Sequence, residues 1–159
     1  MKLVDLAGKK CIERAAAAQQ HHNFSHAHQI DILNKMFLGG DEPVCHTLVR
    51  ELGKKRYGYY QQDLRKKRVV DISGVLTMNE LEEKLVASKL RCLYCRHGVL
   101  LFYRHVREPR QWTLDRIDNE QPHTSINTCV ACLECNLTRR VTSHSGYIFT
   151  KNLTIRKLD

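Results

Sequence analysis

Residues 92–140 read CLYCRHGVLLFYRHVREPRQWTLDRIDNEQPHTSINTCVACLECNLTRR, and this stretch decides the fold. It opens with Cys92-x-x-Cys95 and carries a second unit of the same kind, Cys132-x-x-Cys135, near its end. A C-x-x-C turn lets two thiolates converge on one ion, and two such turns complete a tetrahedral four-cysteine site. Because four thiolates leave no open ligand position, we predict a structural Zn²⁺ held by Cys92, Cys95, Cys132 and Cys135.

The chain has 7 cysteines in all, an odd number that argues against a framework of disulfide bonds. Cys129-x-x-Cys132 is an alternative second pair of metal ligands. We favour Cys132 with Cys135 because of the residues that follow Cys135. Cys11, Cys45 and Cys129 are then predicted to be buried free thiols.

The segment between the two cysteine pairs contains strand-like and turn-forming stretches. Residues 112–119 are predicted to form a strand that enters a turn, and residues 127–131 a second strand. Residues 132–140 then open a helix. The sequence therefore predicts an α+β fold of strand, loop, strand and helix, closed by zinc at its base. After it, two short strands or a tail that packs back are expected at residues 146–149 and 153–155.

The N-terminal part of the chain is predicted to be mostly helical. Apolar residues recur at roughly helical spacing over residues 2–20, and residues 30–38 form a second predicted helix. A third, short helix is expected at residues 44–52, and it is predicted to end at Gly53.

Thr77 and Glu80 have the spacing of a capping box, in which two residues satisfy the free N–H groups at a helix start. This predicts a helix over residues 78–88 that runs into the first cysteine pair. We expect a domain boundary near residue 72, shortly before this helix. Residues 1–72 would form a helical, basic accessory segment that binds nucleic acid, and residues 73–159 the zinc-containing domain.

Lys and Arg number 26 against 17 Asp and Glu, which gives a formal net charge of +9. Such a surplus favours a polyanionic partner, and nucleic acid is the commonest one. The charge concentrates in residues 54–68, where interleaved tyrosines can stack on bases or sugars. A solvated helix face with its tyrosines packed on the core is the structural alternative. The predicted nucleic-acid contacts here are Lys54, Lys55, Arg56, Arg65, Lys66, Lys67 and Arg68.

The sequence shows no sign of a membrane span or a leader. No apolar run approaches the roughly 18–20 residues that a membrane span needs. The N-terminus meets an acidic residue at Asp5 and has no continuous apolar region, so we predict no signal peptide. These features favour an intracellular protein, of the cytoplasm or the nucleus.

Three short motifs carry a resemblance to a known family. They are L-D-R-I-D-N at residues 114–119, P-H-T at residues 122–124 and C-x-x-C-N-x-x-R-R at residues 132–140, with Asn127 between the last two. Together they resemble the ββα-metal core of HNH endonucleases, in particular the zinc-stapled members with D-R-I-D-N in place of D-H-I. The similarity covers residues 92–140, about a third of the chain. The N-terminal half is more weakly similar to homing-type nucleases of large DNA viruses and phages, so a viral or phage origin fits.

The resemblance implies a role for each matching residue. Asp115 and Asn136 would bind a catalytic Mg²⁺ or Mn²⁺, because a hard divalent cation prefers carboxylate and carbonyl oxygens. Asn127 would fix the loop and orient the general base. Each residue also has a structural alternative: Asp115 can cap a turn, Asn136 can cap a helix N-terminus, and Asn127 can satisfy backbone groups of the loop.

The chain departs from the family pattern at the general base. That base is usually the His of D-H, and the same position here is Arg116, which stays protonated and cannot take a proton from water. His123 is therefore predicted as the base, with Asp118 as second choice, and a simple loop residue or phosphate contact is the alternative for His123. Arg116, Arg139 and Arg140 are expected to contact phosphates.

The leading interpretation is a metal-dependent DNA endonuclease that hydrolyses phosphodiester bonds, with Zn²⁺ holding the fold and Mg²⁺ or Mn²⁺ serving the reaction. A catalytically inactive, zinc-stapled nucleic-acid-binding protein is the main alternative, and a zinc-dependent interaction adaptor is the third. RNA is not excluded as the substrate. A site with one catalytic metal cuts one strand, so cleavage of both strands would need a second copy and hence a homodimer.

Overall fold

The structure, a computed structural model, describes residues 12–14, 21–68 and 74–153. The predicted α+β class is confirmed, because the described part contains five helices and a two-stranded antiparallel sheet. In chain order the elements are α2 (His26–Phe37), α3 (Pro43–Arg65), α4 (Met78–Ala87), β1 (Trp112–Arg116), β2 (Thr128–Cys132), α5 (Leu133–Arg139) and α6 (His144–Asn152).

The predicted N-terminal helices are confirmed in part. The helix expected over residues 2–20 lies outside the described residues, except for residues 12–14, which are bridged to His105 and are not helical. Helix α2 matches the helix predicted over residues 30–38 but begins earlier. It begins at His26 because the Ser25 hydroxyl caps it, accepting a hydrogen bond from the backbone N–H of His28 at 3.2 Å.

Helix α3 is much longer than predicted. It begins at Pro43, a favourable first helical residue, and continues to Arg65, so the predicted end at Gly53 is wrong. A glycine inside a helix costs about 1 kcal/mol relative to alanine. However, the part of α3 after Gly53 is anchored to the rest of the fold: Tyr59 packs against the core and its hydroxyl accepts from the backbone N–H of Leu114 at 3.0 Å, and buried Asp63 accepts from the backbone N–H of His123 at 2.8 Å. Packing therefore outweighs the glycine, and most of the basic cluster lies on one continuous helix.

Helix α4 confirms the predicted capping box. The backbone N–H of Glu80 donates to Thr77 Oγ1 at 3.3 Å, and the backbone N–H of Thr77 donates to Glu80 Oε2 at 2.8 Å. The two contacts satisfy N–H groups that a helix start otherwise leaves free. Leu81 and Leu85 then point into the core and are fully buried.

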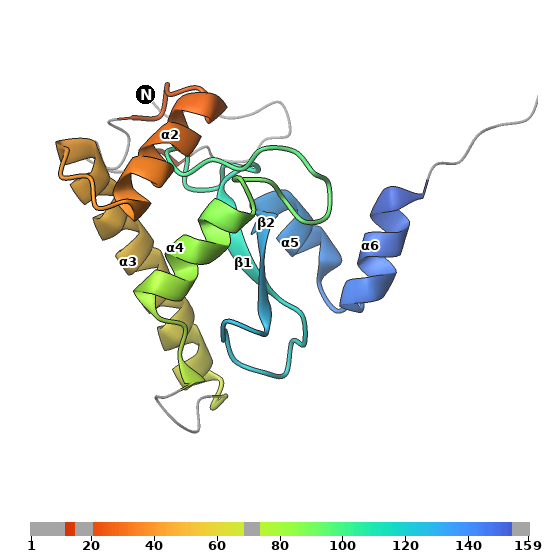
Figure 1. Cartoon of the computed structure of the whole chain (residues 1–159). Helices are drawn as coiled ribbons and strands as arrows, with labels where there is room; N and C mark the ends of the chain where they lie inside the picture. Colours follow the sequence, from red (N-terminus) through yellow and green to blue (C-terminus); the bar gives the residue numbers. More distant parts are fainter. Residues whose placement is uncertain (1–11, 15–20, 69–73, 154–159) are drawn as a thin grey trace, which may run out of the picture.

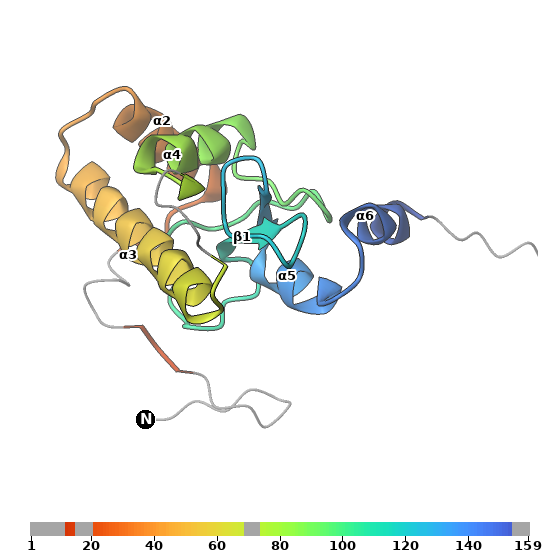
Figure 2. The same ribbon diagram turned by 90° about the horizontal axis from the view of Figure 1, so that it is seen from below.

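The sheet and α5 lie between a group of three helices and the single helix α6. Figure 1 shows α2, α3 and α4 on one side and α6 on the other, and the view from below in Figure 2 shows the same order. One buried cluster joins Leu33 of α2, Leu48 of α3 and Leu85 of α4 to Leu114 of β1. The domain boundary near residue 72 stays a prediction, and helices from both sides of it share this core.

The central hairpin and helix agree with the sequence-based elements to within three residues. Strands β1 and β2 pair antiparallel from Trp112 opposite Cys132 to Arg116 opposite Thr128. Helix α5 starts directly after Cys132 and returns along the sheet, so its last residues lie near the far end of β1. The hairpin therefore has two distinct ends, one at the cysteines and one at the loop between the strands.

Helix α3 covers the edge of β1 that β2 leaves free. The backbone N–H of Leu114 donates to the Tyr59 hydroxyl at 3.0 Å, and Lys55 Nζ donates to the carbonyl of Trp112. An uncovered strand edge leaves backbone groups without partners, and these two side chains supply some of them. The N-terminal helices are thus fastened directly to the strand that carries Asp115.

The C-terminal part differs from expectation. Residues 146–149 belong to helix α6 and not to a strand, so that prediction is wrong, and residues 154 and 155 lie outside the described residues. Ser143 caps α6 by accepting from the backbone N–H of Gly146 at 3.2 Å, and Tyr147 packs edge-on against Tyr94 with ring centroids 4.9 Å apart. None of the described helices combines the length and the apolar character that crossing a membrane requires.

Candidate functional site

The four cysteines predicted as metal ligands come together at the end of the hairpin where β2 passes into α5. The sulfur atoms of Cys92, Cys95, Cys132 and Cys135 all lie within 4.8 Å of one another, and those of Cys95 and Cys132 are 3.9 Å apart. An ion bound tetrahedrally at a metal–sulfur distance of roughly 2.3 Å sets its sulfurs about 3.8 Å apart. The cluster is therefore a candidate metal site.

Local backbone geometry turns both cysteine pairs inward. In the first pair, the N–H of Cys92 donates to the carbonyl of His97 at 2.9 Å, and the N–H of Arg96 donates to the carbonyl of Cys92 at 3.0 Å. Arg96 closes this tight turn with a positive φ of 62°. In the second pair, Cys132 caps α5, and its sulfur accepts from the N–H of Cys135 at 3.4 Å.

The electrostatics of the cluster favour a cation. A hydrogen bond from Cys132 lowers the pKa of Cys92, and the same bond raises the pKa of Cys132. Burial raises the pKa of Cys135. The cluster therefore accommodates one thiolate readily and opposes further ones, and a bound cation is what would let all four ionise together.

The two other cysteines that the structure describes, Cys45 and Cys129, lie outside this cluster. Cys129 is half-buried, with its sulfur 3.7 Å from the Tyr94 hydroxyl, so Cys129 with Cys132 is not the second ligand pair. Cys45 is a buried free thiol, as predicted. Cys11 lies outside the described residues.

A pocket of about 420 Å³ lies at the opposite end of the hairpin, where the loop between the strands meets α5 and the end of α3. Asp115, His123 and Asn136, which sequence motifs singled out, all line it. Four basic side chains line it as well: Lys66, Arg68, Arg116 and Arg140. Residues from three motifs and from the N-terminal helices thus meet in one cavity.

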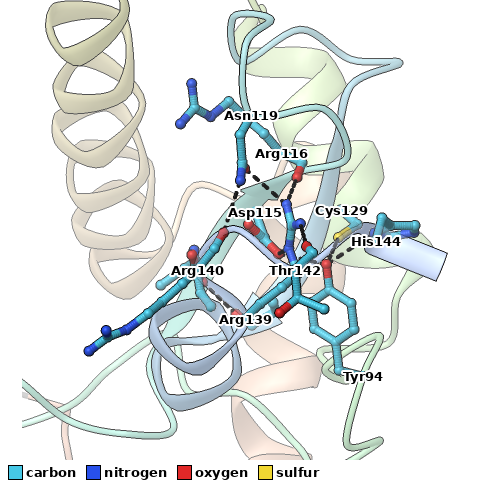
Figure 3. Close-up of polar contacts among 12 residues, drawn as sticks. Tyr94, Asp115, Arg116, Asn119, Cys129, Arg139, Arg140, Thr142 and His144 are labelled. Atoms are coloured by element: carbon cyan, nitrogen blue, oxygen red, sulfur yellow. Dashed lines mark hydrogen bonds and ion pairs between the residues drawn. The ribbon is translucent and has the colours of Figure 1, made fainter. Parts of the chain in front are cut away.

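Asp115 is buried at the wall of this pocket, with 5% of its surface exposed. Its Oδ2 accepts hydrogen bonds from the Tyr94 hydroxyl at 2.6 Å and from Arg139 Nε at 2.7 Å (Figure 3). Burial raises the pKa of Tyr94, which keeps this hydroxyl protonated and able to donate. Among the described residues, no hydrogen bond reaches the second carboxylate oxygen, Oδ1.

The expectation that Arg139 contacts phosphate is wrong for this arrangement. Arg139 is 1% exposed, and each of its three guanidinium nitrogens donates to the ion pair with Asp115 or to another acceptor. Nη1 donates to the carbonyl of Thr142 at 2.6 Å, and Nη2 donates to Asn119 Oδ1 at 3.0 Å and to the carbonyl of Arg116. Arg139 therefore has a structural role inside the protein, where it connects β1, the interstrand loop and the segment after α5. Its neighbour Arg140 is exposed and points away from Asp115 (Figure 3).

The two asparagines have different surroundings. Asn136 is half-buried and its Nδ2 donates to Thr113 Oγ1 at 3.1 Å and to the carbonyl of Leu114 at 3.3 Å, so its carbonyl oxygen is the free end. It does not cap α5, because Cys132 does. Asn127 clasps the loop: its Oδ1 accepts from the N–H of Asp118 at 2.9 Å, and its Nδ2 donates to two loop carbonyls. Asn127 shapes the loop and does not line the pocket.

His123 is held by α3, a contact that the sequence analysis missed. The buried carboxylate of Asp63 accepts, through Oδ2, from the backbone N–H of His123 at 2.8 Å and pairs with its Nδ1 at 2.9 Å. The ring packs against Tyr59 with centroids 4.7 Å apart. Burial lowers the pKa of His123, and the hydrogen bond to Asp63 opposes that shift only in part. Asp118, the second choice as base, is exposed and does not line the pocket.

The predicted basic contacts divide into exposed and internal side chains. Arg65, Lys66 and Lys67 are exposed at the end of α3, and Lys54 is exposed about three turns earlier, with its Nζ 3.1 Å from Glu51 Oε1. Arg68 lines the pocket, and its Nη1 is buried with no hydrogen-bond partner in the part of the chain that the structure describes.

Three other basic residues are turned inward. Lys55 donates to Gln111 Oε1 at 3.0 Å and lies over the Trp112 ring, and burial lowers its pKa to about 7, so its predicted nucleic-acid contact is wrong. Arg56 is half-buried and donates to the carbonyl of Leu76 at 3.0 Å. The side chain of Arg116 is 11% exposed and lies 3.9 Å from Asp63, yet it still lines the pocket.

Comparisons of the chain with known protein families, with curated proteins and with solved structures find no match.

Proposed function

We propose that the four-cysteine cluster holds a structural Zn²⁺. Four buried or half-buried sulfurs are the ligands of a closed site, which gives the ion no position for a substrate. The cluster joins the segment after α4 to the start of α5, so a bound ion would tie these two parts of the chain together. This role is stabilising and leaves any reaction to the other end of the hairpin.

We further propose that the protein is a metal-dependent endonuclease acting on DNA, with a ββα-metal core of the HNH kind formed by β1, β2 and α5. One observation carries the proposal: Asp115, His123 and Asn136, three of the four residues predicted to be catalytic, line a single pocket. They come from a strand, a loop and a helix, so their convergence does not follow from proximity in sequence.

The oxygen atoms of the pocket fit a catalytic Mg²⁺ or Mn²⁺. Asp115 Oδ1 and the carbonyl oxygen of Asn136 are both without a hydrogen-bond partner among the described residues, and such oxygens are the ligands that hard cations prefer. When bound, the ion would polarise a phosphate and stabilise the leaving oxygen. Asp115 and Asn136 would hold it, and water and substrate would supply the remaining ligands.

His123 fits the general base. Because burial lowers its pKa, the imidazole is neutral near pH 7 and has a lone pair to accept a proton from water. With Nδ1 engaged by Asp63, the nitrogen left for this task is Nε2, for which the described residues offer no partner. Asn127 contributes by clasping the loop that carries His123.

The charges of the pocket suit a phosphodiester backbone. The four basic side chains around it outnumber its two acids, Asp115 and Glu120. Lys66 and Arg140 line the pocket and are exposed, so both can donate to a phosphate oxygen. Exposed Arg65, Lys66 and Lys67 continue the positive charge along the end of α3, where they would contact flanking phosphates.

One observation favours a second candidate, a catalytically inactive nucleic-acid-binding protein. The ion pair with Arg139 already neutralises Asp115 and uses one of its oxygens twice. A carboxylate in this state attracts a divalent cation less than a free one does, since the guanidinium opposes the incoming charge. The basic surface would bind nucleic acid equally well in this case.

Nicking of supercoiled plasmid separates the two candidates. The wild type should nick with added Mg²⁺ or Mn²⁺, and Asp115→Asn and His123→Ala should not. Asp115→Asn is a more specific test than Asp115→Ala, because its amide oxygen can still accept hydrogen bonds from Arg139 and Tyr94 while the negative charge is removed. The metal-free arm should omit Mg²⁺ and not use a chelator, which would strip the zinc. Salt-sensitive binding without nicking would favour the inactive protein, and nicking by Asp115→Asn at the wild-type rate would refute the proposed site.

A further inference from the structure

The contact between Asp63 and His123 joins two segments that the sequence keeps far apart. Asp63 is 2% exposed, on the last turn of α3, and His123 is 7% exposed, in the loop between β1 and β2. A single oxygen, Asp63 Oδ2, meets both the backbone N–H and the ring Nδ1 of His123. The loop is therefore docked on α3 by its main chain and by its imidazole together.

This geometry determines which nitrogen of the neutral ring carries the proton. A carboxylate has no proton to donate near neutral pH and accepts only, so Nδ1 must be the N–H and Nε2 the lone pair. Tyr59, four residues before Asp63 on the same face of α3, packs against the ring with the centroids 4.7 Å apart. An unrestrained histidine in water prefers the opposite tautomer, with the proton on Nε2.

We propose that Asp63 is a positioning residue of the active site, which fixes His123 as the Nδ1–H tautomer and so presents the Nε2 lone pair to the pocket. Helix α3 then completes the reaction centre, in addition to carrying basic side chains. Arg116 Nη1, 3.9 Å from the other oxygen of Asp63, helps to hold the carboxylate in place. This inference rests on the proposed function, because a base has a role only if a reaction takes place.

The tautomer can be observed without any activity. Two-bond ¹⁵N–¹H correlation spectra of the full-length, zinc-loaded protein at pH 7.5 should show His123 with its proton on Nδ1. In Asp63→Ala the spectrum should move toward the Nε2–H tautomer. Asp63→Asn retains an oxygen of the same shape and should keep the loop in place while weakening the tautomer preference. Circular dichroism and bound zinc confirm that each variant is folded.

The same proteins are then assayed on supercoiled plasmid under single-turnover conditions. We expect Asp63→Ala to nick about tenfold or more slowly, with its Kd for duplex DNA changed less than about threefold, because positioning acts on the reaction step and not on binding. Asp63→Asn should fall between Asp63→Ala and the wild type. The matched control is Asp41→Ala, which removes an exposed carboxylate that pairs with His46 far from the pocket and should leave the rate unchanged.

The outcomes distinguish this inference from the proposed function. If the wild type does not nick at all, the endonuclease proposal fails, and the inference falls with it whatever the spectra show. If the wild type nicks and Asp63→Ala keeps either the Nδ1–H tautomer or the wild-type rate, only the inference is overturned. A shifted tautomer together with a slower reaction and unchanged DNA affinity supports both.

Discussion

The two ends of the β1–β2 hairpin carry sites that are built in opposite ways. At one end, four identical ligands come from two short turns, and all of them are visible in the sequence as C-x-x-C units. At the other end, different side chains from α3, β1, the interstrand loop and α5 converge on one pocket. The first site depends on local spacing and the second on tertiary packing.

This difference teaches where single-residue changes act. Replacing one cysteine removes one of the four predicted metal ligands. It changes no residue of the pocket, although the fold around the pocket becomes less stable. Removing one pocket residue affects its neighbours, because Asp115 is paired with Arg139 and His123 with Asp63. The cluster should therefore govern stability, and the pocket should govern activity through coupled contacts.

The largest expected effect is that of losing the metal. Cys135→Ser, or chelation, should lower the melting temperature by roughly 10 °C or more, because the binding energy of a structural zinc is folding energy. Thermal unfolding followed by circular dichroism, with the zinc content measured in the same samples, checks this. Cys129→Ser is the matched control, since Cys129 lies outside the cluster. If the melting temperature fell equally in Cys135→Ser and Cys129→Ser, the four-cysteine cluster would hold no stabilising ion.

The same contrast explains how far sequence reasoning reaches. The cysteine ligands, the strand–strand–helix order and the capping box at Thr77 are local patterns, and the structure agrees with each. The continuation of α3 past Gly53 was not predictable from local signals, because contacts of Tyr59 and Asp63 with β1 and the interstrand loop stabilise it. Helix α6 was missed because its aromatic and β-branched residues suit strands equally well in isolation.

In the pocket, the residue types were predictable and their partners were not. Asp63 stood out only as the single acid within the basic run of residues 54–68, and no spacing rule connects it to a histidine sixty positions away. Arg139 and Arg140 are adjacent in sequence and similar in chemistry, yet one is buried against Asp115 and the other is exposed. Only the packing of α5 on β1 distinguishes them.

Loss of the proposed general base, His123, should give the next largest effect. His123→Ala should slow single-turnover nicking by about 10²–10⁴-fold, the usual contribution of a positioned base, while the melting temperature falls far less than in Cys135→Ser. Parallel rate and unfolding measurements on both variants sharpen the comparison of the two ends. A His123→Ala protein that nicks like the wild type would leave the pocket without its proposed base.

The ion pair between Asp115 and Arg139 predicts a stability effect inside the pocket. Asp115→Ala leaves a buried guanidinium uncompensated and should lower the free energy of unfolding by about 3–5 kcal/mol. Asp115→Asn keeps an acceptor for Arg139 and should cost less. Urea unfolding of the two variants measures the difference. If Asp115→Ala and Asp115→Asn lower the free energy of unfolding equally, Arg139 is held by its other acceptors. The two ends of the hairpin would then be less distinct than proposed.

The pH dependence of the reaction provides a test without any mutation. The base must be neutral, so the rate should be constant above the pKa of His123 and fall as pH drops through it, by about tenfold per unit. Since burial lowers that pKa, the fall should begin below the ordinary histidine value of about 6.5. Measured rates from pH 5 to 8 should show this limb in the wild type. A limb centred above pH 7 would indicate another titrating group.

The smallest effects should come from the exposed basic residues, which surround the pocket without taking part in its internal contacts. Lys66→Gln and Arg140→Gln should each weaken duplex binding modestly and reduce the slope of log K against log salt by about 0.9, the value for one phosphate contact. Fluorescence anisotropy at several salt concentrations measures the slope. Lys55→Gln is the informative control: this buried amine should leave the slope unchanged and lower the melting temperature instead. If Lys55→Gln reduced the slope as much as Lys66→Gln, Lys55 would have to contact the nucleic acid, and the buried face of α3 would have to open. Burial would then no longer distinguish the basic residues that support the fold from those that bind nucleic acid.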